Sequence, residues 1–335
     1  MTYLESINNS LHEMMSVNPN IVMIGEDLKD PYGGAFKVSK GLSTKYPNQI
    51  ISTPISEQAI VGSAIGMAMC NMRPIVEIMF GDFLTLCVDQ IVNHAAKYNW
   101  MYNGQISVPL VIRTPMGGGR GYGPTHSQSL ESMFLSVSGI SIISPSIFHD
   151  PGAMLAKCVT KDDNPCLFIE NKASYPKDLV IGNEYKDFYI QRIKNEIFED
   201  VYLSLYPDDK SDILIITYGG MSEMAVESAR KIFLDEEVSV DVLIMASIKP
   251  LNIDLIIDRA RTVGRVLVLE EGNQIGGWGA EGSSVIHEKA FDTLDLPVQR
   301  LGALDCPIPS CMPMESEVLP TVKKICKVIK KSLIN

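Results

Sequence analysis

The sequence predicts an α/β protein of two domains, a larger one built on a parallel β-sheet followed by a smaller α/β domain. Short, continuously apolar runs alternate with helical stretches along most of the chain. This alternation is typical of parallel strands covered by helices on both faces. It is interrupted between residues 172 and 211 and then resumes. The 335 residues also exceed the length at which a single core stops growing, about 250 to 300 residues.

The first domain is expected to span residues 1–185. It opens with a helix over 3–18, where apolar residues recur at helical spacing. Further on, short apolar runs predict strands and the stretches between them predict helices. The expected strands are 21–24, 49–52, 74–80, 108–113, 140–143 and 166–169. One helix is expected to begin at residue 57, and two others are expected over 86–100 and 148–161.

The second domain is expected to span residues 205–335. Residues 172–211 carry Pro176, Pro207 and many charges, and residues 206–211 form a cluster of turn residues, so the domain boundary is placed here. The expected strands are 213–218, 239–244, 266–269 and 298–301, and the expected helices are 222–234, 253–261, 279–291 and 316–332. The lysines of the last helix are interpreted as a solvated face.

The stretch from Thr53 to Gly66 organises the first domain. A β-favouring run ends at Pro54, and Ser56 offers a side-chain oxygen to the free amides of the following helix. Glu57 then falls in the first helical turn, where any acid is stabilised by the helix dipole, so a purely structural role is an open alternative. Gly62 and Gly66 lie on one helix face, each at a cost of about 1 kcal/mol relative to alanine. We therefore expect something to approach that face closely.

Composition excludes several classes of protein. A net charge of −11 argues against nucleic acid as the main partner, because phosphate binding needs clustered Lys and Arg. The seven cysteines include no CxxC pair, which favours a reducing compartment. No apolar run reaches the roughly 20 residues that span a bilayer, and the N-terminus resembles neither a signal nor a transit peptide. We expect a cytoplasmic protein, although a mature organellar protein without its presequence would look the same.

A glycine-rich run over residues 116–126 invites a phosphate-loop interpretation, because exposed backbone amides can bind anions. The run contains neither GxxxxGK[ST] nor GxGxxG. It is better interpreted as a flexible loop after a strand end, where ligands gather in parallel sheets. His126 closes this run, and a single histidine is more often structural than functional. The other four histidines have no better claim to function.

Metal sites and catalytic triads are not indicated. The nearest pair of cysteines, Cys306 and Cys311, has no second pair to complete a zinc site. The motifs HExxH and GxSxG are both absent.

The order and spacing of several short motifs resemble one family across nearly the whole chain. These motifs are Ile24-Gly25-Glu26-Asp27, Thr53-Pro54-Ile55-Ser56-Glu57 with Gly62 and Gly66, residues 89–97, His126-Ser127-Gln128-Ser129, Asp163-Asn164-Pro165, Glu270-Glu271-Gly272 and Leu319-Pro320. The chain resembles the β subunit of the E1 component of 2-oxo acid dehydrogenase complexes. That group includes pyruvate, branched-chain and acetoin enzymes and belongs to the thiamine-diphosphate enzymes of the transketolase superfamily.

The resemblance implies a fold and four site residues. The first domain would be the pyrimidine-binding domain and the second a transketolase C-terminal-type domain that chiefly supports assembly. Glu57 would be the catalytic acid that binds the pyrimidine of the cofactor, and Phe83 would stack on the aminopyrimidine. His126 would face the thiazolium and the substrate. Glu26 would lie in the water-filled path between paired active sites.

The resemblance also implies partners. Enzymes of this superfamily usually hold the diphosphate and Mg²⁺ through a GDG motif followed by Asn, whereas this chain has only Gly81-Asp82-Phe83. Thiamine diphosphate would therefore be shared with an E1 α subunit that holds the Mg²⁺, in an α₂β₂ heterotetramer. The acyl group would pass to the lipoyl domain of an E2 acyltransferase.

Three alternatives stay open at this point. One is an acetoin-type β subunit or a related thiamine-diphosphate enzyme, since residues 307–311 depart from the common family sequence and leave the substrate undetermined. A second is a non-catalytic assembly subunit, against which the presence of both Glu57 and His126 counts. A third is a free-standing transketolase-like enzyme, which the missing diphosphate motif disfavours.

Overall fold

The structure is a computed structural model that describes residues 1–195 and 198–334. The chain forms two compact units, and each draws on separate stretches of sequence. The first contains Met1–Met116, Met133–Ile143 and Asp150–Leu179. The second contains Gly117–Ser132, Ser144–His149 and the chain from Val180 onward. The glycine-rich loop, which follows a strand of the first unit, therefore belongs to the second.

The first unit is built on a parallel sheet, which confirms the predicted fold class. Its strands run in the order β5-β6-β4-β3-β1-β2, and every neighbouring pair is parallel. They are β1 (Ile21–Glu26), β2 (Ile50–Thr53), β3 (Arg73–Glu77), β4 (Val111–Met116), β5 (Ser141–Ile143) and β6 (Cys166–Asn171). Strands β1, β4 and β6 are buried at every position, as their continuous apolar runs predict.

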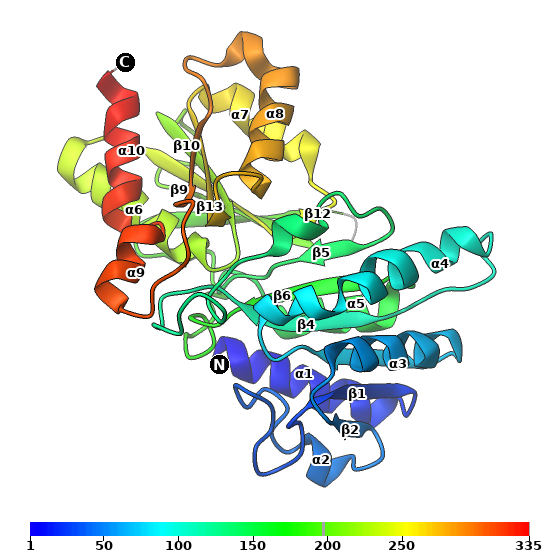
Figure 1. Cartoon of the computed structure of the whole chain (residues 1–335). Helices are drawn as coiled ribbons and strands as arrows, with labels where there is room; N and C mark the ends of the chain where they lie inside the picture. Colours follow the sequence, from blue (N-terminus) through cyan, green and yellow to red (C-terminus); the bar gives the residue numbers. More distant parts are fainter. Residues whose placement is uncertain (196–197, 335) are drawn as a thin grey trace. The chain divides into compact units, whose positions relative to one another are not determined.

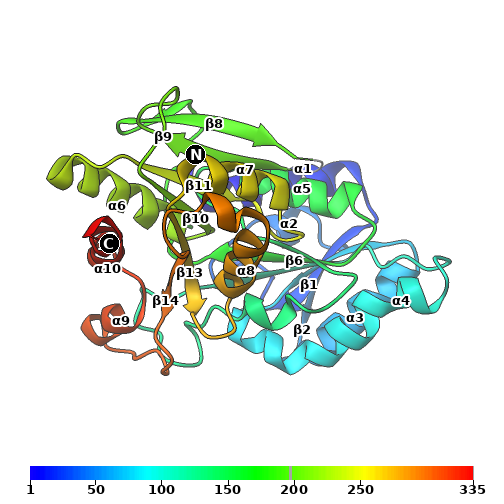
Figure 2. The same ribbon diagram turned by 90° about the horizontal axis from the view of Figure 1, so that it is seen from above.

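Helices cover both faces of this sheet (Figure 2). Helices α1 (Tyr3–Val17) and α5 (Pro151–Lys161) pack together on one face, and α3 (Glu57–Met69) and α4 (Ala96–Met101) lie along the other. The short helix α2 (Leu42–Lys45) precedes β2. The helix expected over 86–100 is divided into a 3-10 helix (Gly81–Cys87), a π-helical turn (Gln90–Ala95) and α4. Single π-turns of this kind are frequent at functional sites.

A buried ionic cluster joins three neighbouring strands of this sheet. Arg113 of β4 donates from Nε to Oε1 of Glu170 at 2.8 Å and from Nη2 to Oε2 at 2.5 Å, and Glu170 lies on β6. Its Nη1 donates to Glu77 at the end of β3. The Tyr175 hydroxyl also donates to Glu170. All three charged side chains are at least 95% buried, so each depends on its partners for the solvation that burial removes.

The second unit is built on a mixed sheet in the order β14-β13-β10-β11-β9-β8-β7. Strands β10, β11, β13 and β14 are parallel to one another, and β7, β8 and β9 continue the sheet in antiparallel fashion. The strands are β7 (Glu184–Tyr185), β8 (Phe188–Lys194), β9 (Glu199–Ser204), β10 (Ile213–Tyr218), β11 (Val240–Met245), β13 (Val266–Asn273) and β14 (Gln299–Ala303). A short strand, β12 (Ser247–Lys249), follows β11.

Helices lie on both faces of the second sheet (Figure 1). Helices α6 (Met221–Glu236) and α10 (Val322–Ile334) pack together on one face, and α7 (Ile253–Val263) and α8 (Trp278–Ala290) cover the other. The helix expected over 316–332 is two helices, α9 (Met312–Val318) and α10. They are separated at Leu319 and Pro320, because a proline disfavours helical geometry in the residue before it.

The stretch 172–211 holds more structure than a boundary segment would. Strands β7, β8 and β9 all lie within it. Strand β8 alternates buried and exposed residues at its start, with Phe188 and Ile190 inside and Tyr189 outside. Among residues 1–195 and 198–334, no helix is both long and apolar enough to cross a membrane.

Candidate active site

Glu57 begins helix α3, as the sequence predicts. Strand β2 ends at Thr53, three exposed residues follow, and the helix starts at Glu57. The Glu57 side chain is only 6% exposed, although both of its neighbours in sequence are exposed. An ordinary first-turn acid would point into solvent, so this burial distinguishes Glu57 from that alternative.

The expected capping role of Ser56 is wrong. Ser56 is the N-cap residue, but its side chain makes no capping hydrogen bond. Its backbone angles, φ −168° and ψ 87°, lie outside the geometry in which a side-chain oxygen reaches the first free amides.

Glu26 is brought close to Glu57 by the pairing of β1 with β2. Glu26 ends β1, lies opposite Thr53, and is 7% exposed. Burial raises the pKa of Glu26, and the negative charge of Glu57 raises it further, while a hydrogen bond from the Ser56 backbone opposes the shift. Its Oε1 has no hydrogen-bond partner among the described residues. Two neighbouring acids, one of which holds its proton more tightly than usual, form a pair able to store and release a proton.

Phe83 lies in the 3-10 helix Gly81–Cys87, which packs against α3. Its ring is half-buried and meets the ring of Phe80 edge to face at 5.8 Å between centroids. Cys87, at the end of the same segment, is close enough to sense Glu57. Burial raises the pKa of the Cys87 thiol to about 12, and the charge of Glu57 adds to this effect. The segment carrying Phe83 and the start of α3 are thus neighbours.

Gln90 is a site candidate that sequence reasoning did not single out. It opens the π-helical turn, and its Oε1 is buried without a hydrogen-bond partner among the described residues. Its Cγ lies 3.9 Å from where a Cβ on Gly62 would be. A buried, unsatisfied amide oxygen is uncommon in native proteins. The only feature of the sequence that points to Gln90 is that it lies within the motif at residues 89–97, and that motif does not indicate what Gln90 does.

The expected close approach to the glycines of α3 does not occur among the described residues. Apart from the chain next to Gly66 and the backbone of α3 itself, no described atom lies within 4 Å of a Cβ built on Gly66, and the nearest to one built on Gly62 is the Gln90 Cγ. Both glycines are exposed, as are Ala59 and Ser63 on the same face. The described residues therefore leave this face of small side chains uncovered.

His126 belongs to the second unit, and Glu26, Glu57 and Phe83 belong to the first. His126 is half-buried, its Nδ1 lies 3.0 Å from the Thr125 hydroxyl, and its backbone amide donates to the Gly123 carbonyl. Its immediate support is therefore the end of the glycine-rich loop.

Two buried acids of the second unit hold the glycine-rich loop. Gly118 donates its backbone amide to Glu271 at 2.6 Å. Gly119 and Gly121 donate theirs to the two carboxylate oxygens of Glu315, both at 2.9 Å. Glu315 is 2% exposed, so the loop amides supply solvation that its charge would otherwise lack. The loop does bind anions, as its composition suggests, but these anions are carboxylates of the chain itself rather than a phosphate.

Glu315→Gln is expected to loosen this loop. Gly119 and Gly121 each donate to a different oxygen of Glu315. Glutamine has only one oxygen, so one of the two glycine amides loses its acceptor. Hydrogen bonds to charged groups contribute about 1.5 to 3 kcal/mol. Backbone amide exchange at Gly119 and Gly121 should become faster, measured by NMR or mass spectrometry. Glu317→Gln, an exposed acid on the same helix, is the matched control and should change neither rate. Unchanged exchange in the Glu315 variant would rule out this anchoring role.

The first unit fits the aminopyrimidine part of thiamine diphosphate. That ring needs a carboxyl group at one edge and an apolar surface against its face. Glu57 supplies a buried carboxyl group, and Phe83, on the neighbouring segment, supplies an aromatic ring. The diphosphate part needs anion donors and a metal, and the loop amides that could serve already bind Glu271 and Glu315. The described residues contain no cluster of three His, Cys, Asp or Glu side chains arranged for a metal.

Two family models match the chain. The pyrimidine binding domain of transketolase matches residues 1–177, and the C-terminal domain of transketolase matches residues 205–325. Fold and site thus define a transketolase-type protein with a pyrimidine-binding domain. Among curated proteins, the chain is 34% identical to the mitochondrial pyruvate dehydrogenase E1 component subunit beta-1 of Oryza sativa subsp. japonica, over 99% of this chain and 86% of that protein.

Bacterial relatives match over a similar length. The pyruvate dehydrogenase E1 component subunit beta of Rickettsia bellii is 30% identical over 97% of this chain and 98% of its own. The acetoin:2,6-dichlorophenolindophenol oxidoreductase subunit beta of Cupriavidus necator is 30% identical over 98% and 96%. The chain belongs to the family of E1-type β subunits, with transketolase pyrimidine-binding and C-terminal domains.

A solved structure supports the same fold. A split-gene transketolase, described as an inactive β₄ tetramer, superposes with a TM-score of 0.73 at 20% identity, over 100% of this chain and 98% of that one. At this identity the likeness concerns the fold alone.

Proposed function

We propose that the chain is the β subunit of a heterotetrameric, thiamine-diphosphate-dependent 2-oxo acid dehydrogenase, the E1 component. The enzyme would decarboxylate a 2-oxo acid such as pyruvate and acylate the lipoyl domain of an E2 acyltransferase. The observation that carries the proposal is the buried Glu57 at the start of α3, with Glu26 beside it and the Phe83 segment packed against the helix. The nearly full-length similarity to E1 β subunits supports it.

The site residues have separate tasks in this proposal. The bound cofactor supplies a carbon nucleophile that adds to the 2-oxo group and takes up the electrons released by decarboxylation. Glu57 holds a proton at the edge of the pyrimidine, in a buried position where water does not compete. Phe83 orients the ring, and Glu26 stores a proton next to Glu57. His126 carries a proton to or from the oxygen that derives from the substrate carbonyl.

A second polypeptide completes the site in this proposal. An α subunit would bind the diphosphate and hold the Mg²⁺, and two copies of each subunit would form α₂β₂. The uncovered face of α3 supports such assembly. Glycines in a helix destabilise it unless their small size serves close packing, and Gly62 and Gly66 have no such packing within the described chain. A neighbouring subunit packed against α3 would account for both glycines.

Binding of the cofactor tests the shared site. The isolated chain should bind thiamine diphosphate with Mg²⁺ weakly, because a buried diphosphate needs paired donors and a metal. Co-expression with an α partner that carries GDG and a downstream Asn should restore tight binding, measured by calorimetry. Low-micromolar binding by this chain alone would defeat the shared site. A well-formed α₂β₂ complex that binds cofactor but turns over none of several 2-oxo acids would instead favour a non-catalytic assembly subunit.

A second candidate function is cleavage of acetoin. The similarity to the Cupriavidus necator acetoin oxidoreductase subunit, over 96% of its length, favours it. Assaying the assembled enzyme with pyruvate, branched-chain 2-oxo acids and acetoin, with an artificial electron acceptor, distinguishes the two. We further propose a cytoplasmic location, which fractionation of the source cells can test.

A further inference from the structure

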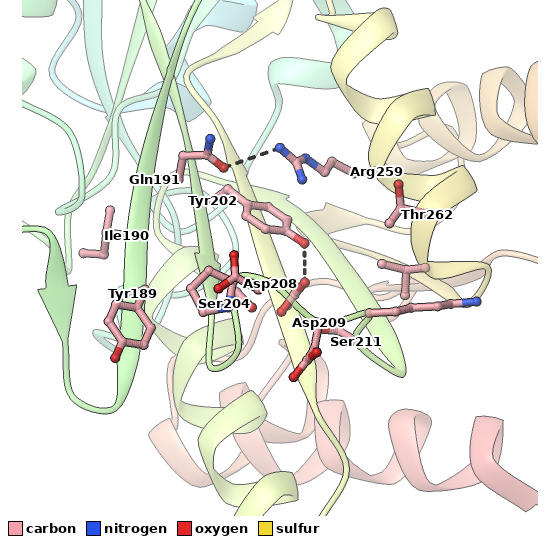
Figure 3. Close-up of a pocket in the computed structure, with 14 residues that line it drawn as sticks. Tyr189, Ile190, Gln191, Tyr202, Ser204, Asp208, Asp209, Ser211, Arg259 and Thr262 are labelled. Atoms are coloured by element: carbon pink, nitrogen blue, oxygen red, sulfur yellow. Dashed lines mark hydrogen bonds between the residues drawn. The ribbon is translucent and has the colours of Figure 1, made fainter.

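A pocket lies entirely within the second unit, far along the chain from the residues proposed to act on the cofactor. Strands β8 and β9, the start of β11, the turn over 206–211 and helix α7 surround it (Figure 3). Its volume is about 540 Å³, within the range of about 300 to 1,000 Å³ usual for small-molecule sites. The proposed function gives no task to this pocket.

The strand register builds the floor of the pocket. Tyr189 of β8 lies opposite Ser204 of β9, and Leu203 lies opposite Val242 of β11. Because facing residues of an antiparallel pair share a side of the sheet and side chains alternate along a strand, Tyr189, Ser204 and Asp241 lie on one side. Helix α7 covers that side and contributes Arg259.

Asp241 is a buried acid with one free oxygen. It is 2% exposed, and its Oδ2 accepts a hydrogen bond from the Tyr202 hydroxyl. Its Oδ1 has no hydrogen-bond partner among the residues that the structure describes. Burial raises the pKa of Asp241, and nearby hydroxyls and the charge of Arg259 oppose that shift. A buried carboxylate with an unsatisfied oxygen is costly to the fold, and a ligand bound to that oxygen would offset the cost.

Arg259 places a positive charge over the ring of Tyr202. Its guanidinium carbon lies 4.4 Å from the centroid of the Tyr202 ring. One Nη lies 3.4 Å from the Gln191 side-chain oxygen (Figure 3). Its Nε is buried and makes no hydrogen bond in the described part of the chain, although it lies 3.7 Å from the carboxylate of Asp258, an ion pair too long to satisfy it. Tyr202 thus touches an acceptor at its hydroxyl end and a donor over its ring.

We propose that this pocket binds an α-amino acid in its zwitterionic form, the ammonium group on Asp241 and the carboxylate on Arg259. A simple anion would meet Arg259 but be repelled by Asp241, and a simple cation would meet Asp241 but be repelled by Arg259. An α-amino acid carries both charges a few ångströms apart, which matches a donor and an acceptor that contact the same tyrosine. The remaining volume accommodates its side chain.

Calorimetry on the full chain at pH 7 tests the proposal with glycine, L-alanine and L-leucine as probes. Sodium acetate and ethylammonium chloride each carry one of the two charges. At least one amino acid should bind about tenfold or more tightly than either single-charge probe. Equal binding of acetate or ethylammonium would overturn the proposal, as would no saturable binding of any amino acid up to about 10 mM.

Two matched variants assign the binding to this pocket. Arg259→Met removes the guanidinium but keeps an unbranched side chain over Tyr202, and it should weaken amino-acid binding about tenfold or more. Arg261→Met changes an arginine on the same helix that instead donates to the Lys289 carbonyl, and it should leave affinity unchanged. If the two variants weaken binding equally, or neither does, the pocket is not the site. Asp241→Asn repeats the test from the anionic side, with thermal unfolding as the check that each variant folds. Because the readout is binding to this chain, its failure leaves the E1 proposal untouched.

Discussion

Replacing Glu57 with glutamine is expected to lower turnover of the assembled enzyme by about 10²- to 10⁴-fold, the range for loss of one general acid or base. Glutamine has nearly the same shape and fits the same buried position, but it cannot exchange a proton with the pyrimidine. The fold should persist, because the lost helix-dipole interaction is only about 0.3 to 1 kcal/mol. Steady-state assays with the 2-oxo acid, together with circular dichroism, measure both effects.

The matched control is Glu223→Gln. Glu223 is likewise an acid in the first turn of a helix, α6, and has no proposed catalytic task. Its replacement should leave turnover within about twofold, since the helix-dipole interaction that a first-turn acid loses is only about 0.3 to 1 kcal/mol. Near-normal turnover in the Glu57 variant would return that residue to a purely structural role.

Replacing His126 with alanine is expected to lower turnover by about 10²-fold or more, the scale of losing one preorganised donor. Cofactor affinity should change little, because Glu57 and Phe83, on the other unit, are proposed to hold the pyrimidine. The two effects are separated by calorimetry with thiamine diphosphate and by acyl transfer to a lipoyl acceptor, both on the assembled complex.

A half-buried histidine outside the proposed site provides the comparison. His12 lies on α1, with its ring 5.9 Å from that of Tyr46, and His12→Ala should leave both measurements unchanged. If His126→Ala loses cofactor affinity in parallel with turnover, or loses neither, the role proposed for His126 is wrong.

Much of the fold could be predicted because its signals are local. Strands β1 and β10 each begin with four consecutive apolar residues, and they lie where the sequence predicts. The start of α3 at Glu57 follows from Pro54 and the helical spacing after it. These features depend on a few adjacent residues and on whether they are buried. The pattern of apolar residues in a short segment indicates both.

Other features could not be read from local patterns. Strands β8 and β9 carry charged and polar residues among their apolar ones, so their segment resembles a linker. Only the pairing of β9 with β11 and of β8 with β9 reveals them. The anchoring of the glycine-rich loop by Glu315 joins residues almost 200 positions apart. The free oxygen of Asp241 and its partner Tyr202 depend on strand register. Non-local contacts of this kind leave no trace in spacing along the chain.

The ionic cluster of Glu77, Arg113 and Glu170 has a consequence for how this chain can diverge. Loss of one member of a buried ion cluster costs about 3 to 5 kcal/mol, whereas apolar replacement of the whole cluster can be neutral. The free energy of unfolding of a domain is only about 5 to 15 kcal/mol. A lineage that changes Arg113 alone therefore passes through poorly folded intermediates. The three positions should therefore be inherited as a block, and a library randomising all three at once should yield folded apolar triples that stepwise mutation rarely reaches.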